Sequence, residues 1–579
     1  MSAPLPVHTA RPAPRRAAGD SRPMRVMLLC SAFNGLSQRA WVELVDAGLE
    51  VQVQIAGDAV AVRAAVSAMG PDLVLCPFLR ERVPADVWKA WPTVIIHPGP
   101  TGDRGPSSLD WALMDAEGVW GVTAVQAVEE MDAGPIWGTR TFPIDGPPRK
   151  SDLYNGAVTD AAVQLIHEVV AKAGDPDFVP DPLDYARPDV TGRLRAAVRR
   201  ADRAVNWSDE TRHILRKIRA ADGSPGVRTE LCGLPVAVFD AYESQGVGGP
   251  AHRPGAVISR GHGAVQVATG DGSLWIGQLQ DVTDPFTSGL KLPATSVLDG
   301  RLHHVPEALP GAAPREIHYH RDGAVGVLSF DFYNGAMSTR QCRRLELALQ
   351  HATEQDTRVL LLRGGPTFSN GIHLGVIEAA NDPGAEAWAN IVAIDDVCRQ
   401  IISCVDQIVV CSVGGNAGAG GVMLALGADR VVLRDGVVLN PHYRTMGLYG
   451  SEYWTYVLPR RVGQHVARTM TRACDPVGTA QALRTRLADH VVRGDRTAFD
   501  TAMIRYARQL AERADYPNLL ADKRNSREAD EECRPLHAYR SAELDRMWSD
   551  IVHDANDFAS ARRMFLHKGR PQRSTAITA

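Results

Sequence analysis

Short apolar runs alternate with amphipathic stretches along the first part of the chain. Four runs have the length and composition of buried strands: MRVMLLC (24–30), VQVQIAG (51–57), PDLVLCPF (71–78) and TVIIHPG (93–99). Strands that alternate with helical stretches at this spacing predict a parallel, doubly wound α/β sheet, which we expect over residues 24–190. Ligands of such sheets bind at the carboxyl ends of the strands, where the segment HPGPTGDRG lies.

The pattern changes near residue 195. A helical piece, DETRHILRKIRA, is followed by the alternating segments LPVAVFDAY, AVQVATG and LWIGQLQ, with Gly-rich turns between them. This predicts a small OB-like β-barrel domain over residues 195–302. Residues 303–321 contain Pro and Ala and are expected to be a linker. Its histidines, His303, His304, His318 and His320, have no spacing of Cys, Asp or Glu around them that completes a metal site, so none is predicted.

A second α/β unit is predicted over residues 322–500. Strand-like AVGVLSFD, a helical stretch and TRVLLLRGG come first, and the chain returns to an apolar strand at DRVVLRDGVVL. Residues 501–565 are helical and highly charged, and we expect them to form a helical C-terminal extension. The Pro- and Arg-rich residues 1–23 are expected to be a disordered tail, and residues 566–579 a second tail.

Composition limits the classes of function. A chain of 579 residues is expected to form two to four domains. The net charge of −4 does not favour nucleic-acid binding, and no apolar run is long enough to predict a membrane span. The nine cysteines are scattered without a CxxC pair, which is typical of free thiols in a reducing compartment. Residues 1–23 have no apolar core of a secretory signal, so we expect a cytoplasmic protein.

Two side chains near the first sheet could act on a carbonyl group. His97 ends an apolar strand and precedes Pro-Gly, and Asp132 lies in a Gly-flanked turn further along. A histidine and an aspartate on neighbouring strand ends can polarise a carbonyl and shuttle a proton. The pair is therefore a candidate catalytic site.

The segment around these residues resembles the 10-formyltetrahydrofolate-dependent formyltransferases. Their motifs match in order at His97, Arg104-Gly105, Gly121-Val122-Thr123 and the turn 132–136. The segments NWSDETRHILRKIRA, SPGVRTEL and ATGDGSLWI resemble the carboxyl-terminal domain of that family, so the resemblance covers about residues 24–300. It implies that 10-formyltetrahydrofolate is the formyl donor and that His97 and Asp132 are catalytic.

The resemblance also places Ile95, Arg104 and Gly105 at the substrate pocket. Ile95 stands where the family has an asparagine that helps to hold the formyl oxygen, and the loop after His97 is shorter than in methionyl-tRNA formyltransferases. We therefore expect an acceptor other than charged tRNA.

Two glycine-rich turns mark the second half: LLRGGPTFSNGIHLG (361–375) and VVCSVGGNAGAGGVMLALGAD (409–429). Unpaired backbone N–H groups at such turns can form an oxyanion hole. The segments FSNGIHL and GGNAGAGGVML resemble motifs of the crotonase (enoyl-CoA hydratase/isomerase) superfamily. That resemblance implies a ββα spiral fold, a coenzyme A thioester ligand, and oxyanion donors at the N–H groups of Ile372 and Gly420.

The hydratase glutamates of that superfamily are missing, since Met423 and His442 occupy their positions. The segment NPHYRTMGLYGSEYW (440–454) offers other acid/base candidates, among which we leave the choice open: His442, Tyr443, Tyr449 and Glu452. Basic side chains that could hold the coenzyme A diphosphate are Arg39, Lys523, Arg524 and Arg527.

The fusion of two such halves, with the segments FNGLSQR and NPHYRTMGLYGSEYWTY, resembles a family of hydrogenase maturation factors over residues 24–565. The resemblance implies carbon monoxide synthesis for nickel–iron hydrogenase: formyl transfer from 10-formyltetrahydrofolate to coenzyme A, then decarbonylation of formyl-CoA. The implied partner is the hydrogenase maturation machinery or the large-subunit precursor. Two alternatives are a formyltransferase or hydrolase fused to an independent acyl-CoA-processing domain, and a non-catalytic scaffold that binds folate or coenzyme A.

Overall fold

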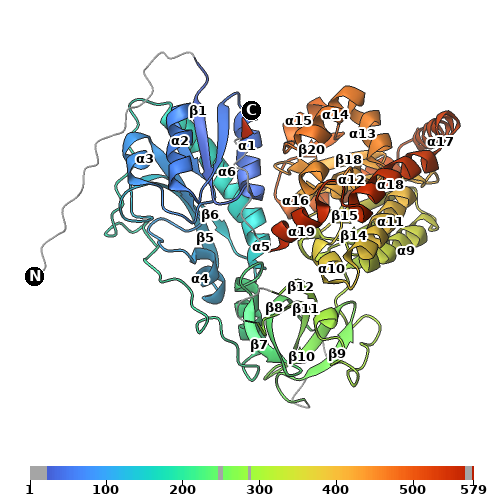
Figure 1. Ribbon diagram of the computed structural model, residues 1–579, viewed down its shortest axis with the longest axis horizontal. Coiled ribbons are helices and arrows are strands. Elements are labelled where there is room, and N and C mark those ends of the chain that lie inside the picture. The colour runs from blue at the N-terminus through green and yellow to red at the C-terminus, as the bar shows by residue number, and fades with distance from the viewer. Residues whose placement is uncertain (1–21, 245–251, 285–288, 568–576, 579) are drawn as a thin grey trace, which may run out of the picture. The chain divides into compact units, whose positions relative to one another are not determined.

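A computed structural model describes residues 22–244, 252–284, 289–567 and 577–578. The chain divides into two compact units, residues 1–199 with 573–579 and residues 200–572 (Figure 1). Of the expected tail 1–23, residues 1–21 lie outside the described ranges. No helix in the described ranges is long and apolar enough to cross a membrane.

The first unit contains a seven-stranded sheet of order β21-β2-β1-β3-β4-β5-β6. Its strands are β1 (Arg25–Cys30), β2 (Glu50–Ile55), β3 (Leu73–Cys76), β4 (Thr93–His97), β5 (Val119–Gln126), β6 (Ile136–Pro143) and β21 (Ile577–Thr578). β2, β1, β3 and β4 are parallel, which confirms the predicted sheet, whereas β5, β6 and β21 pair antiparallel. β21 falls in the segment that we expected to be a tail, so the expectation of a tail does not hold for residues 577–578.

Helices connect strands of this sheet: α1 (Gly35–Asp46), α2 (Ala59–Met69), α3 (Ala85–Ala90) and α4 (Ser108–Met114). After β6 come α5 (Lys150–Leu153), the π-helical turn η1 (Tyr154–Val158) and α6 (Thr159–Ala173). Asn34 and Asp58 cap α1 and α2 by accepting backbone N–H groups. The apolar face of α2 packs with Met27 and Val74 of the sheet. This packing leaves the carboxyl ends of the parallel strands to carry the site.

The second unit begins with an antiparallel domain, as predicted. Its sheet has the order β7-β8-β11-β10-β9, with β12 paired to β11. The elements are α7 (Thr211–Ala220), β7 (Val227–Leu231), β8 (Leu234–Glu243), β9 (Val257–Gly261), β10 (Ala264–Ala268), β11 (Ser273–Asp281), β12 (Lys291–Pro293) and α8 (Ala294–Val297). The sheet and α7 enclose one apolar core.

The crotonase-like part has a six-stranded sheet of order β13-β14-β15-β16-β18-β20 and a two-stranded sheet of β17 and β19. The strands are β13 (Ile317–Asp322), β14 (Val325–Phe330), β15 (Val359–Gly364), β16 (Ile408–Val413), β17 (Ala417–Gly418), β18 (Arg430–Arg434), β19 (Leu439–Asn440) and β20 (His490–Val492). β13 lies largely within the expected linker 303–321. Ile317 and Tyr319 face the core and alternate with exposed His318 and His320, which is the pattern of an edge strand.

Helices cover this sheet and form the extension: η2 (Tyr333–Gly335), α9 (Thr339–Thr353), α10 (Leu374–Ala379), α11 (Pro383–Ile402), α12 (Gly420–Leu426), η3 (Tyr443–Met446), α13 (Trp454–Val462), α14 (Gln464–Ala473), α15 (Thr479–Arg484), α16 (Arg496–Ala511), α17 (Tyr516–Cys533), α18 (Leu536–Val552) and α19 (Phe558–Leu566). The helical extension is confirmed, and it begins with α16 at Arg496 instead of at 501. α18 packs on α11 and buries Glu543 and Met547.

The antiparallel domain packs directly on the crotonase-like part within the second unit. The Tyr333 hydroxyl donates to Asp222 Oδ1 at 2.5 Å. The Lys291 ammonium lies 4.0 Å from the centre of the Phe239 ring and 3.1 Å from the Tyr333 hydroxyl oxygen. Because Ala237, Phe239 and Tyr333 share one buried cluster, the expected linker 303–321 does not separate independent bodies.

Candidate active sites

His97 is the last residue of β4, and its side chain is buried between two carboxylates. Nε2 lies 2.9 Å from Asp103 Oδ2, and Nδ1 lies 3.7 Å from Asp132 Oδ1. The structure thus brings the predicted residues His97 and Asp132 together. It adds Asp103, which the sequence analysis missed.

The other predicted residues of this half shape the turn that carries Asp132. Asp132 has a positive φ of 58°, and its Oδ2 accepts the N–H of Gly105 at 3.3 Å. Arg104 pairs with Glu130 and donates from Nε to the carbonyl of residue 131. Ile95, two residues before His97 on β4, packs beside the apolar cluster under α2. Arg104 and Gly105 therefore position the carboxylate next to His97.

A second site lies in the other unit, where a cavity of about 890 Å³ opens between the antiparallel domain and the crotonase-like part. Five predicted residues line it: Ile372, Gly420, His442, Tyr443 and Glu452. Apolar side chains, among them Ile391, Met446, Leu448 and Met547, form much of its wall. A cavity of this size and lining can hold the acyl end of a thioester.

The two glycine-rich turns meet at this cavity. A Cβ built on Gly371 would lie 3.3 Å from the Gly420 nitrogen, so the two turns are in contact. Gly420 is the first residue of α12, where N–H groups have no partner inside the helix. Within the described ranges, neither the N–H of Ile372 nor that of Gly420 donates to a protein acceptor. Both donors are thus available to a carbonyl oxygen.

Glu452 lies against these donors. A Cβ on Gly420 would lie 2.1 Å from Glu452 Oε1, so only glycine lets the carboxylate approach so closely. Tyr443 donates to Glu452 Oε2 at 2.7 Å, and the Ser451 hydroxyl donates to the same oxygen at 3.0 Å. Glu452 and Tyr453 have successive positive φ values of 61° and 58°, which turn the carboxylate inward.

Two further buried carboxylates lie behind Glu452, and the sequence analysis did not identify either. The Glu452 N–H donates to Asp395 Oδ1 at 2.7 Å, and Glu543 accepts from Thr455. Burial raises the pKa of Glu452, and it raises the pKa values of Asp395 and Glu543 to about 8. Among the described residues, Asp395 Oδ2 and Glu543 Oε2 have no hydrogen-bond partner. Arg540 Nε, 3.8 Å from Asp395 Oδ2, is a cation beside this cluster, and it compensates the negative charge only in part.

His442 is a neutral member of the cavity wall. Its Nδ1 lies 2.8 Å from the carbonyl oxygen of Asn440, and burial lowers the pKa of the imidazole. Nδ1 therefore carries the hydrogen and donates, which leaves Nε2 as an acceptor. Met423, at the other missing-glutamate position, is fully buried in the core.

Tyr449 is not brought to the cavity, although the sequence analysis grouped it with His442, Tyr443 and Glu452. Its side chain is 38% exposed, and its ring packs against Trp454 with 5.3 Å between ring centres. The left-handed Gly447 and Gly450 on either side redirect the chain there. From the aromatic and polar residues over 440–454 alone, this change of chain direction could not be predicted.

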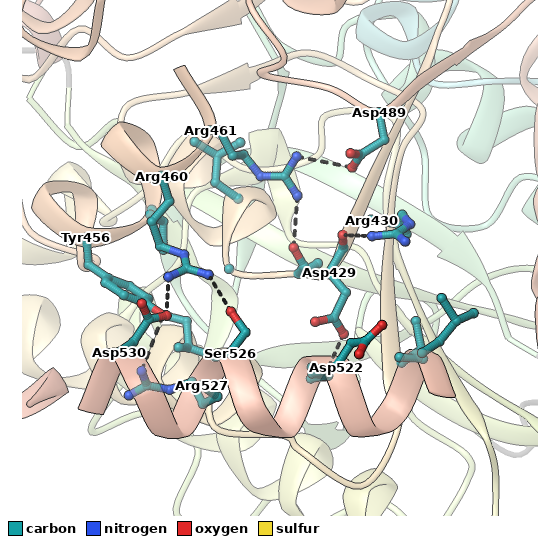
Figure 2. Close-up of a pocket in the computed structure, with 18 of the residues that line it drawn as sticks. Asp429, Arg430, Tyr456, Arg460, Arg461, Asp489, Asp522, Ser526, Arg527 and Asp530 are labelled. Atoms are coloured by element: carbon teal, nitrogen blue, oxygen red, sulfur yellow. Dashed lines mark hydrogen bonds and ion pairs between the residues drawn. The ribbon is translucent and has the colours of Figure 1, made fainter. Parts of the chain in front are cut away.

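The basic residues predicted to bind coenzyme A form ion pairs with acidic side chains of the protein or line another pocket. Arg39 in the first unit pairs with Glu43 and Asp160. Lys523 and Arg527 of α17 line a separate pocket of about 440 Å³, in which Lys523 pairs with Asp429, Arg460 with Asp530 and Arg461 with Asp489 (Figure 2). Arg524 pairs with Asp406. None of the four lines the cavity of Gly420.

Comparison with known proteins agrees with this arrangement. The enoyl-CoA hydratase/isomerase family model matches residues 329–574, and the model of the formyl transferase C-terminal domain matches residues 197–286. Methionyl-tRNA formyltransferase of Sorangium cellulosum is 30% identical over 178 residues, which are 31% of this chain and 55% of that protein.

Two relatives match along almost the whole chain. HoxX, a hydrogenase maturation factor of Bradyrhizobium diazoefficiens, is 43% identical over 558 residues, 96% of each protein. The crystal structure of HypX from Aquifex aeolicus in complex with tetrahydrofolic acid superposes with a TM-score of 0.90 at 36% identity, covering 96% of this chain and 98% of that one. The chain belongs to the HypX/HoxX family of hydrogenase maturation factors.

Proposed function

We propose that this protein makes carbon monoxide for the active site of nickel–iron hydrogenase, in two steps. The first unit transfers the formyl group of 10-formyltetrahydrofolate to coenzyme A, and the second unit splits formyl-CoA into carbon monoxide and coenzyme A. The tetrahydrofolate complex of the Aquifex aeolicus relative supports folate as the carrier. The crotonase-like cavity supports a thioester as the second substrate. The hydrogenase maturation machinery or the large-subunit precursor is the proposed recipient of the product.

The formyl site supplies a base and a charge. His97 accepts the proton of the thiol as sulfur attacks the formyl carbon, and Asp132, 3.7 Å from Nδ1, stabilises the imidazolium that forms. The tetrahedral intermediate then releases tetrahydrofolate, whose nitrogen takes the proton back from His97. Ile95 leaves an apolar wall where the related enzymes have an amide, which suits a thiol acceptor.

In the second unit, decarbonylation removes a proton from carbon and expels sulfur. The N–H groups of Ile372 and Gly420 polarise the formyl oxygen. The ionised carboxylate of Glu452 takes the formyl proton, the electrons of the C–H bond become the carbon lone pair of carbon monoxide, and the C–S bond breaks with its electrons on sulfur. The thiolate then takes the proton back from Glu452, which regenerates the base and free coenzyme A.

The observation that carries this proposal is the contact of the Glu452 carboxylate with Gly420. A buried base beside a crotonase-like oxyanion hole is suited to taking a proton from the polarised carbon. Because Met423 and His442 occupy the positions of the hydratase glutamates, the site is not suited to adding water. Tyr443 and Ser451 stabilise the charged form of this base by hydrogen bonds.

The test measures carbon monoxide in the headspace above the intact protein after addition of 10-formyltetrahydrofolate and coenzyme A. The wild type is expected to release one carbon monoxide for each formyl group consumed. His97→Ala should yield none from the folate and still decompose synthetic formyl-CoA. Glu452→Gln should consume the folate and accumulate formyl-CoA. Glu346→Gln is the matched control, since Glu346 pairs with Arg399 outside the cavity.

Other products would refute the proposal and separate its rivals. Formate without carbon monoxide would indicate a hydrolase beside an independent acyl-CoA-processing domain. Binding of folate and coenzyme A with neither consumed would indicate a scaffold. Normal carbon monoxide release by both His97→Ala and Glu452→Gln would remove both sites from the reaction.

A further inference from the structure

A second carboxylate holds His97 more closely than Asp132 does. Asp103 follows His97 by six residues, is 2% exposed, and places Oδ2 2.9 Å from His97 Nε2. The 3.7 Å between Nδ1 and Asp132 is beyond hydrogen-bond distance. Within the described ranges, Asp103 is thus the only hydrogen-bond partner of the His97 ring.

The loop after β4 is built to allow this contact. A Cβ on Gly99 would lie 2.3 Å from Asp103 Oδ2 and 2.7 Å from His97 Nε2, so any other residue there would push the two groups apart. The backbone of Arg195 pairs with that of Arg104 at 2.9 Å and holds the far end of the loop. Two separate segments thus position the Asp103 carboxylate.

The charge of Asp103 is compensated only by a distant cation that other carboxylates share. Arg195 Nε lies 3.9 Å from Asp103 Oδ1, while the other nitrogens of that guanidinium donate to Asp115 and Glu117 at 2.9 and 3.3 Å. Oδ1 has no hydrogen-bond partner among the described residues. A buried carboxylate with an unpaired oxygen costs stability, which indicates a role in the site instead of in packing.

We propose that Asp103 is a positioning residue that fixes the proton-accepting tautomer of His97. Because the Asp103 carboxylate accepts a hydrogen bond from Nε2, the ring hydrogen lies on Nε2 and Nδ1 keeps a lone pair. The inference rests on the proposed function, in which Nδ1 takes the thiol proton as the S–C bond forms. It deepens that function by assigning the atom that takes the thiol proton, because a thiol reacts as its thiolate and needs such a base.

The step balances without any further reactant. The S–H proton moves to Nδ1, sulfur bonds to the formyl carbon, and the carbonyl electrons move onto oxygen. When the carbonyl re-forms, the C–N bond to the folate breaks, and the nitrogen receives the proton from Nδ1. During the step the imidazolium lies between Asp103 and Asp132, with one negative charge on each side.

The experiment compares Asp103→Asn with the wild type in the intact protein, by consumption of 10-formyltetrahydrofolate with coenzyme A at several pH values. An amide can donate to Nε2 and favour the other tautomer. At pH 7 we expect kcat to fall by about 10²- to 10⁴-fold, the effect of the equivalent change in a Ser-His-Asp triad being about 10⁴. The KM for the folate should stay within about twofold, since Asp103 acts through His97 alone.

A readout specific to this role is the pH profile. The loss should shrink as the pH rises above about 9, because a thiol with an ordinary pKa near 8.5 then ionises without a base. Asp103→Ala should show the same pH-dependent loss. Asp72→Asn is the control, since Asp72 is a paired carboxylate of this unit at the opposite ends of the strands.

The outcomes distinguish the inference from the function on which it rests. If the wild type does not consume the folate with coenzyme A, the proposed function fails and the inference fails with it. If the wild type is active and Asp103→Asn stays within threefold of it at every pH, only the inference is wrong. An equal loss at all pH values, or loss of tetrahydrofolate binding in both variants, would mean a structural role and would also overturn it.

Discussion

Replacing Glu543 by Gln should stabilise the protein at pH 8 and leave its stability nearly unchanged at pH 5. Glu543 is fully buried on α18, and its Oε1 accepts from the N–H and hydroxyl of Thr455. A glutamine oxygen can accept the same two bonds, so the substitution removes charge and little else. Oε2 has no hydrogen-bond partner among the described residues, so no partner there is lost.

The magnitude follows from the raised pKa. Burial, with the charge of Asp395 second, raises the pKa of Glu543 from an ordinary value near 4.5 to about 8. Between these values the folded protein binds a proton that the unfolded chain does not, so stability falls as the pH rises. Each pH unit costs about 1.4 kcal/mol, which gives a loss on the order of 4 kcal/mol between pH 5 and pH 8. The glutamine variant does not suffer this loss.

The assay is the thermal unfolding midpoint of wild type and variant at pH 5, 6, 7 and 8. The midpoint difference should grow steadily with pH, to roughly 5 °C or more at pH 8. Glu532→Gln is the control, since Glu532 is exposed on α17 and its replacement changes the net charge equally. A difference that stays constant from pH 5 to pH 8, or a variant less stable at pH 8, would refute the reasoning.

Four other results are expected. Gly420→Ala should reduce formyl-CoA decomposition at least 100-fold with the fold intact, because the new Cβ would displace the Glu452 carboxylate; unchanged turnover would disprove the contact. The rate of formyl-CoA decomposition should rise with pH, because Glu452 must be ionised to act as a base and burial raises its pKa above the ordinary range of a glutamate. A rate that does not change from pH 5 to 9 would contradict this role of Glu452. Crotonyl-CoA should not be hydrated, since Met423 and His442 replace both hydratase glutamates, and robust hydration by pure protein would restore the ordinary crotonase function. Residues 1–199, which lack only the short edge strand β21 of their unit, and residues 200–572 should each be soluble and melt cooperatively when made as separate pieces, whereas pieces divided at residue 305 should aggregate. The reverse pattern would contradict the division into units.

Much of both sites could be predicted from local sequence. His97 follows a buried strand and precedes Pro-Gly, and Gly420 opens a helix after a glycine-rich turn, so each position follows from the order of elements around it. Glu452 could be named as a candidate because it lies in the segment that replaces a known catalytic position. It could not be ranked, since the successive left-handed residues that turn it inward leave no periodic pattern.

The residues that the sequence did not reveal are those whose role depends on distant packing. Asp395 on α11 and Glu543 on α18 are nearly 150 positions apart, and in sequence each resembles the polar face of an ordinary helix. Asp103 lies in an irregular loop, where spacing predicts nothing. The one local signal there was Gly99, whose lack of a side chain leaves room for an unusually close pair.

The packing of Phe239 and Asp222 against Tyr333 has a consequence for synthesis on the ribosome. The strands of the antiparallel domain and α8 end before residue 302, and Tyr333, which covers that face, leaves the ribosome about thirty residues later. At roughly 5–20 residues per second this interval lasts a few seconds, during which the face has only solvent or a chaperone as its neighbour. Ribosomes stalled after residue 302 has left the exit tunnel, but before Tyr333 has, should therefore carry nascent chains to which a chaperone binds, and release should follow once η2 has left the tunnel.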